Sequence, residues 1–132
     1  MYKTGQIIRA KVDHFPLVDH YGIVIVENGN TNIIHNTPFR SSVKDDINTW
    51  LDSRSVMSIY NSNLVNENIE YINYKFKNDC KGKYNLFSYN CEHFIDCMTG
   101  KKQNSEQLNY WIILIVLKIV ITLFLYYFFS KR

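Results

Sequence analysis

The feature that most constrains this chain is an apolar run near its C-terminus. Residues 111–129 read WIILIVLKIVITLFLYYFF, nineteen residues in which Lys118 carries the one charge. A helix of this length rises roughly 28 Å, close to the thickness of the hydrocarbon core of a bilayer. A central lysine costs about 2.5–3.5 kcal/mol on the insertion scale, and each Leu, Ile, Phe or Val returns about 0.3–0.6 kcal/mol. Because the run holds fourteen residues of those four types, we expect a transmembrane anchor helix over residues 110–129.

The anchor divides the chain into three parts. We expect residues 1–100 to form one domain and residues 101–109 to form a polar linker. The N-terminus has no apolar stretch typical of a signal peptide. We therefore expect a single-pass C-terminal anchor in an intracellular membrane, with the domain facing the cytosol. Lys101–Lys102 and Lys131–Arg132 flank both ends, so the distribution of basic residues selects no orientation.

The distribution of charge argues against nucleic acid as a partner. The chain carries a net charge of +3, but residues 1–100 hold 10 basic and 11 acidic side chains and carry −1. The excess of +4 belongs to residues 101–132, beside and within the anchor. A basic surface on the domain is therefore not expected, and the expected partner is the bilayer.

The domain contains the signals of an antiparallel sheet with packed helices. Asn28–Gly29 between two β-branched segments is a strong hairpin signal, and Asn90 and Gly100 are typical helix-capping residues. We expect strands at residues 5–12 and 55–61, a hairpin over residues 20–37, and helices over residues 64–76 and 90–100. This pattern indicates an α+β fold.

The hairpin brings two histidines together. With Asn28 and Gly29 as a two-residue turn, His20 faces Thr37 across the pair of strands. His35, two residues from Thr37, is then on the same face as His20, and the two are diagonal neighbours with Cα atoms about 7–8 Å apart. We therefore expect the two imidazole rings to meet.

Cys91 is the candidate nucleophile. It follows Asn90 at the first turn of a predicted helix, where the helix dipole and free N–H groups favour a thiolate and can hold an oxyanion. A nucleophilic cysteine needs a base, and the base needs a group that orients it. His20 as general base and His35 as the residue that orients it complete a Cys–His–His arrangement.

The remaining cysteines and histidines are expected to be structural. Three cysteines cannot all pair, which favours a reducing compartment in which Cys80 and Cys97 are packing residues. His93 points away from Cys91, and His14 lies in a loop. The chain has no C-x-x-C or H-E-x-x-H spacing, no GxSxG and no glycine-rich phosphate loop, so we expect no metal and no cofactor.

Four segments resemble those of a known enzyme family. GQIIRA, DHYGIVIV, NIIHN and YNLFSYNCEHF are similar, over about residues 5–100, to the lecithin:retinol acyltransferase (LRAT) family, and in layout to its H-Ras-like suppressor phospholipase/acyltransferases. Asp19 is a departure, because that branch commonly has a basic residue before the base histidine. The chain also lacks the long insertion of retinol-specific members, so retinol esterification is the less favoured activity.

The resemblance implies a permuted papain-like fold related to the NlpC-type peptidases. It matches His20 to the family's base, His35 to its second histidine and Cys91 to its nucleophile. Members move a fatty acyl chain from a glycerophospholipid onto the cysteine as a thioester, and then to water, an amine or a hydroxyl, without a cofactor. We keep two alternatives: a peptide or amide hydrolase of the same fold, and a non-catalytic membrane-anchored interaction domain.

Overall fold

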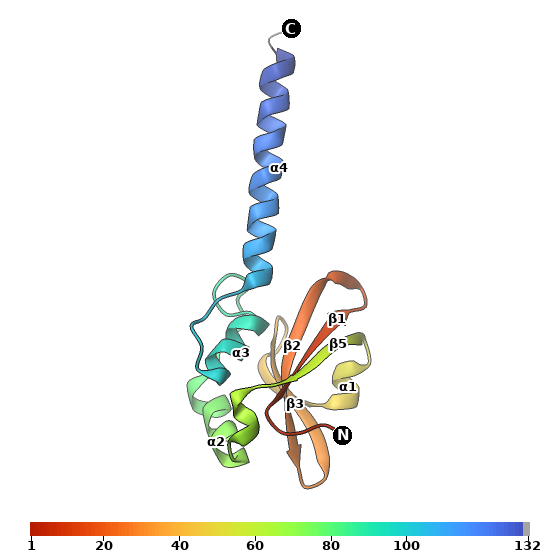
Figure 1. The fold of residues 1–132 in the computed structure, drawn as a ribbon, viewed down its shortest axis with the longest axis vertical. Coiled ribbons are helices and arrows are strands. Elements are labelled where there is room, and N and C mark those ends of the chain that lie inside the picture. The colour runs from red at the N-terminus through yellow and green to blue at the C-terminus, as the bar shows by residue number, and fades with distance from the viewer. Residues whose placement is uncertain (131–132) are drawn as a thin grey trace.

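The computed structural model describes residues 1–130; Lys131 and Arg132, which were expected to flank the anchor, lie outside the described residues. Five strands and several helices form a domain from which one long helix projects (Figure 1). The elements are β1 (Gln6–Val12), β2 (Phe15–Glu27), β3 (Asn30–Thr37), β4 (Ser41–Asp46), α1 (Ile47–Leu51), β5 (Arg54–Asn61), the 3₁₀ helix η1 (Asn63–Asn66), α2 (Ile69–Tyr74), the π-helix η2 (Lys75–Asp79), α3 (Cys91–Thr99) and α4 (Glu106–Ser130).

The strands form one antiparallel sheet in the order β4-β3-β2-β1-β5, which confirms the α+β expectation. α1 packs on one face of the sheet, and α2 and α3 pack on the other. Neighbouring residues such as Ile7 and Ile8 therefore belong to different buried clusters. This explains why the apolar alternation of β1 is interrupted at Ile7–Ile8, where the strand is covered on both faces.

The predicted hairpin forms in the predicted register. Asn28 and Gly29 have φ values of 50° and 78°, the left-handed pair that a tight two-residue turn requires. Glu27 pairs with Asn30, and the ladder continues to Ile23 opposite Ile34. The register that places His20 and His35 on one face is therefore confirmed.

Other elements differ from the expectation. Residues 64–76 do not form one helix; they are divided among η1, α2 and η2, with a break at Glu67–Asn68. Asn68 caps α2 by accepting a hydrogen bond from the Tyr71 N–H, so the polar residue that interrupts the apolar spacing begins a new helix. The strand β4 and the short helix α1 were not predicted.

The C-terminal helix α4 is long and apolar enough to cross a membrane. Its most apolar 18-residue stretch has a mean hydropathy of 2.6, and none of that stretch is buried inside the protein. It leaves the domain at the end where the β1–β2 turn also lies, whereas α2 lies at the opposite end (Figure 1).

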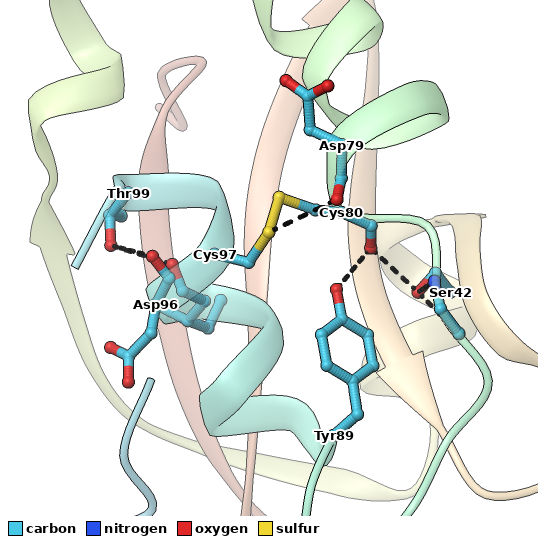
Figure 2. The surroundings of a disulfide bond; sticks show 9 residues. Ser42, Asp79, Cys80, Tyr89, Asp96, Cys97 and Thr99 are labelled. Atoms are coloured by element: carbon cyan, nitrogen blue, oxygen red, sulfur yellow. Dashed lines mark hydrogen bonds between the residues drawn. A yellow bond between two sulfur atoms is a disulfide. The ribbon is translucent and has the colours of Figure 1, made fainter. Parts of the chain in front are cut away.

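The expectation that Cys80 and Cys97 are free packing residues is wrong, because the two form a disulfide (Figure 2). Their Cα atoms are 5.8 Å apart, joining the end of η2 to the second half of α3. The Tyr89 hydroxyl donates to the Cys80 carbonyl oxygen at 2.5 Å. The loop that the disulfide closes contains Cys91, the one free cysteine of the described chain. Sequence spacing alone does not reveal such a pair, since it depends on how α3 packs against η2.

Candidate active site

His20 and His35 meet as the hairpin register predicts. The His20 Nε2 atom lies 3.0 Å from the His35 Nδ1 atom, and both side chains are buried. The two rings are 5.1 Å apart in an edge-to-face arrangement. Trp50 of α1 supports both rings, with its ring centroid 5.7 Å from that of His20 and 6.0 Å from that of His35.

Asp45 of β4 extends this pair, and sequence reasoning missed it. Its Oδ2 atom lies 2.9 Å from the His35 Nε2 atom. Arg40 holds the carboxylate from the other side, with Nη1 donating to Oδ1 at 2.9 Å and a second ion-pair contact to Oδ2. The hydrogen bond from Arg40 keeps the pKa of Asp45 below its usual value. Asp45 is therefore an ionised hydrogen-bond acceptor at the end of a chain of contacts.

That carboxylate determines which nitrogen of each ring carries the proton. Asp45 can only accept, so His35 donates from Nε2, and its Nδ1 is left as an acceptor. His20 then donates from Nε2 to His35, which leaves the Nδ1 atom of His20 unprotonated. Nδ1 of His20 has no hydrogen-bond partner within residues 1–130, so it is the nitrogen available to act as a base.

Burial keeps both histidines neutral. It lowers the pKa of His20 to about 3, with smaller contributions from His35 and Arg54. Burial also lowers the pKa of His35, although Asp45 acts in the opposite direction. At neutral pH the pair is therefore two uncharged imidazoles.

Cys91 begins α3, as predicted. The Asn90 side chain accepts hydrogen bonds from the N–H groups of Glu92 and His93, and His93 Nδ1 accepts from the Asn90 N–H in return. Such reciprocal capping defines the first turn of a helix. Gly100 ends the helix with a left-handed φ of 72°. His93 is thus a structural residue, as expected, and His14 is exposed.

The thiol of Cys91 is neutral, in contrast to the expectation of a thiolate. Burial raises the pKa of Cys91 to about 12, although backbone N–H groups of Tyr21, Glu92 and Cys91 itself favour the thiolate. The Sγ atom donates to the Asp19 carbonyl oxygen at 3.8 Å, not to His20. Desolvation therefore outweighs the helix terminus, and in the resting state both the Cys91 thiol and the His20 imidazole are neutral.

Cys91 and His20 line the same cavity. Its volume is about 420 Å³, and it is enclosed mainly by apolar side chains, several of them from α4. Its wall includes Phe39, Arg54, Leu86, Phe87, Leu108, Trp111, Ile112 and Ile115. The candidate nucleophile, Cys91, and the candidate base, His20, therefore lie in the wall of one mainly apolar cavity.

The residues expected to form a linker are bound to this site. Ser105 is buried, accepts a hydrogen bond from Asn90 Nδ2 at 3.0 Å and donates to the Glu92 carboxylate. Gln107 binds the backbone of Asp19 with both ends of its amide: Oε1 accepts from the N–H at 2.7 Å, and Nε2 donates to the C=O at 3.2 Å. The pairing of β2 with β3 ends at Ile23. Gln107 therefore forms hydrogen bonds with the N–H and C=O groups of Asp19, in the part of β2 that precedes Ile23.

Asp19, which directly precedes His20, is neutralised within the domain. Its carboxylate forms ion pairs with Arg9 and Lys11 of β1. Although burial acts to raise it, the pKa of Asp19 is lowered because Lys11 and Arg9 both bind the ionised form. Asp19 therefore adds no net negative charge next to His20.

The described residues contain no group of three His, Cys, Asp or Glu side chains that could hold a metal ion. Comparison of the chain with protein-family models, with curated proteins and with solved structures finds no match.

Proposed function

We propose that the chain is a membrane-anchored thiol phospholipase A and acyltransferase of the LRAT type, with a permuted papain-like fold. It takes a fatty acyl chain from a glycerophospholipid and passes it to water, an amine or a hydroxyl. The observation that carries this proposal is the shared cavity, in which Cys91 and His20 are enclosed by apolar side chains continuous with α4.

The first half of the reaction forms a thioester. As Cys91 Sγ attacks the ester carbonyl carbon, its proton passes to Nδ1 of His20, and the carbonyl oxygen becomes an oxyanion. Collapse of the tetrahedral intermediate breaks the carbon–oxygen ester bond, and the His20 imidazolium returns the proton to the departing glycerol oxygen. Asp45 and His35 stabilise the imidazolium while it exists.

The second half releases the acyl chain. Water, an amine or an alcohol attacks the thioester carbonyl carbon and gives a proton to His20. The carbon–sulfur bond then breaks, and His20 returns the proton to the sulfur. Since the resting thiol is neutral, proton transfer accompanies each attack and is not completed beforehand.

The cavity suits a substrate that remains in the bilayer. The first turns of α4 supply Leu108, Trp111 and Ile112 to its wall. At the rim, Phe39 is 95% exposed and Phe87 is 69% exposed, large apolar surfaces that water disfavours and acyl chains cover. An acyl chain can therefore move from the membrane along α4 into the cavity without crossing water.

Two sides of the membrane are candidates for the position of the domain. One is the cytosol, which is the orientation expected from the sequence. The Cys80–Cys97 disulfide favours an oxidising compartment, because cytosolic thiols are normally kept reduced. The redox state of these two cysteines in cells distinguishes the two sides.

Intact-protein mass spectrometry tests the proposed function. The full chain, incorporated into phosphatidylcholine vesicles, should gain the mass of one acyl chain, sensitive to hydroxylamine and absent from Cys91→Ser. Cys91→Ala should abolish turnover and His20→Ala should nearly abolish it. His35→Ala should leave measurable activity if His35 only orients the base.

The alternatives predict different results. A chain that is folded, forms no adduct and releases no fatty acid, yet whose Cys91 is acylated by an activated amide or peptide, would be a peptide or amide hydrolase. A chain whose Cys91 reacts with no acyl donor would be an interaction domain, and the lipid proposal would then be wrong.

A further inference from the structure

One arginine lies in the cavity wall without a carboxylate against it. Arg54, the first residue of β5, is half-buried and lines the cavity together with His20 and Cys91. The two other arginines of residues 1–130 form ion pairs, Arg9 with Asp19 and Arg40 with Asp45. Arg54 forms no ion pair in the described chain, and its buried Nε atom has no hydrogen-bond partner.

The guanidinium of Arg54 is held in place by Trp50. Its Cζ atom lies 5.1 Å from the centroid of the Trp50 ring, and its Nη1 atom donates to the Trp50 carbonyl oxygen at 2.5 Å. The same Trp50 ring supports His20. The cation and the candidate base are therefore positioned on one rigid side chain, which sets the spacing between them.

A partly desolvated cation without a counter-ion is unfavourable unless an anion binds it. Burial lowers the pKa of Arg54, which is the sign of this cost. A planar guanidinium binds phosphate oxygens with paired hydrogen bonds and suits that geometry better than a lysine does. In a glycerophospholipid the phosphate and the ester bonds are on the same glycerol, so a cation beside the base is appropriately located.

We propose that Arg54 binds the phosphodiester of the glycerophospholipid substrate while its ester carbonyl lies at Cys91. This inference rests on the proposed function and names the group by which the site selects phospholipids over neutral acylglycerols. Arg54 is a specificity-determining residue in this scheme and takes no part in proton transfer.

A comparison of two substrates tests the proposal. The full chain in mixed micelles is given phosphatidylcholine, or diacylglycerol with the same acyl chains but no phosphate. Arg54→Gln should lower kcat/KM for phosphatidylcholine about tenfold or more, the loss typical of a charge-assisted hydrogen bond. Turnover of diacylglycerol should change by less than about twofold, because no such bond is made.

Two further variants sharpen this test. Arg54→Lys should retain part of the preference for phosphatidylcholine, since it keeps the charge but loses the paired geometry. Lys77→Gln removes the charge of an exposed lysine on η2. This element follows α2, which lies at the opposite end of the domain from α4 (Figure 1), so the variant should behave as the unaltered chain. Equal loss on both substrates for Arg54→Gln would mean that Arg54 only supports Trp50 and His20, and would overturn the proposal, as would no loss on either.

A binding measurement separates this proposal from the proposed function. In the Cys91→Ser chain, a dialkyl ether phosphatidylcholine should bind about tenfold more weakly after Arg54→Gln, and a dialkylglycerol should bind as before. Failure of the unaltered chain to cleave any lipid, with this difference in binding intact, would refute the proposed activity alone. Equal binding with and without Arg54 would refute the phosphate site.

Inorganic phosphate distinguishes the two sources of the same anion. If the site binds the phosphate group of a lipid, inorganic phosphate in large excess should not displace the ether phospholipid, because the alkyl chains supply most of the binding free energy. Full displacement would identify a site for free phosphate and overturn the lipid assignment.

Discussion

His35 is related to Asp45 as His20 is related to His35: each pair consists of diagonal neighbours on adjacent antiparallel strands. His35 faces Val43 across the β3–β4 ladder, and Asp45 is two residues farther along β4. The resulting distance is 2.9 Å from His35 Nε2 to Asp45 Oδ2. The contacts across two successive hairpins therefore fix the proton positions from the partly buried Asp45 carboxylate to the buried His20.

Asp45→Asn should strongly impair turnover. The amide can donate a hydrogen bond to His35 Nε2, which would reverse the donor and acceptor roles and leave a proton on His20 Nδ1. We expect kcat to fall about 100-fold or more, as in other triads in which the wrong tautomer is imposed. Steady-state hydrolysis of phosphatidylcholine measures this loss.

The adjacent residue provides the matched control. Asp46 caps α1 by accepting hydrogen bonds from the N–H groups of Asn48 and Thr49. Because asparagine caps helices as well as aspartate does, Asp46→Asn should leave both turnover and stability unchanged. Similar activity in the two variants would show that Asp45 does not determine the tautomers.

Cys91 should alkylate slowly in the folded protein. Burial raises the pKa of Cys91 to about 12, and the thiolate is the reactive form. In detergent micelles at pH 8, iodoacetamide should modify Cys91 at least about tenfold more slowly than in the same chain unfolded in urea. Faster reaction in the folded chain would support the thiolate that the helix N-terminus alone favours.

The stability of the domain should fall as the pH decreases below about 6.5. Burial lowers the pKa of His20 to about 3, so between these values the unfolded chain binds a proton that the folded chain does not. Each such histidine lowers the free energy of unfolding by about 1.4 kcal/mol per pH unit. Urea unfolding followed by circular dichroism at pH 7.5, 5.5 and 4.5 measures the slope.

Two histidine variants isolate this effect. His20→Gln should make the pH dependence shallower by about one proton, whereas His14→Gln, at an exposed position, should not change it. An unchanged slope in His20→Gln would mean that His20 does not remain neutral in the folded chain.

The disulfide should be present in the protein as cells make it. After acid quenching and denaturation, a maleimide reagent should label one cysteine without reductant and three with it. Reduction should lower the free energy of unfolding by about 3 kcal/mol, the loss expected for a loop of this size. Labelling of all three without reductant would instead support the cytosolic orientation.

Gln107→Ala should weaken the connection between α4 and the domain. The change removes two hydrogen bonds to the Asp19 backbone, each contributing about 1 kcal/mol. We expect faster hydrogen exchange of the Asp19 amide and a several-fold lower kcat/KM on vesicles. Gln103→Ala is the control, because Gln103 is exposed and lies in the same polar segment. Equal exchange in both variants would contradict this role of Gln107.

The sequence by itself determined the features that depend on local spacing. Asn28–Gly29 sets the hairpin register because few other dipeptides adopt its left-handed turn, and the register brings His20 to His35. Asn90 and Gly100 determine both ends of α3 by capping. The run over residues 111–129 specifies an exposed apolar helix by composition alone.

The tertiary structure decided the features that depend on the packing of distant segments. Asp45 lies in a strand with no apolar periodicity, and Cys80 meets Cys97 because η2 packs against α3. Gln107 binds Asp19 of β2, from which it is separated by 88 positions in the sequence, so local sequence patterns do not predict this contact. The ionisation of Cys91 was also decided at this level: the helix terminus is a local feature that favours a thiolate, but burial depends on everything packed around the sulfur, and its cost is the larger effect.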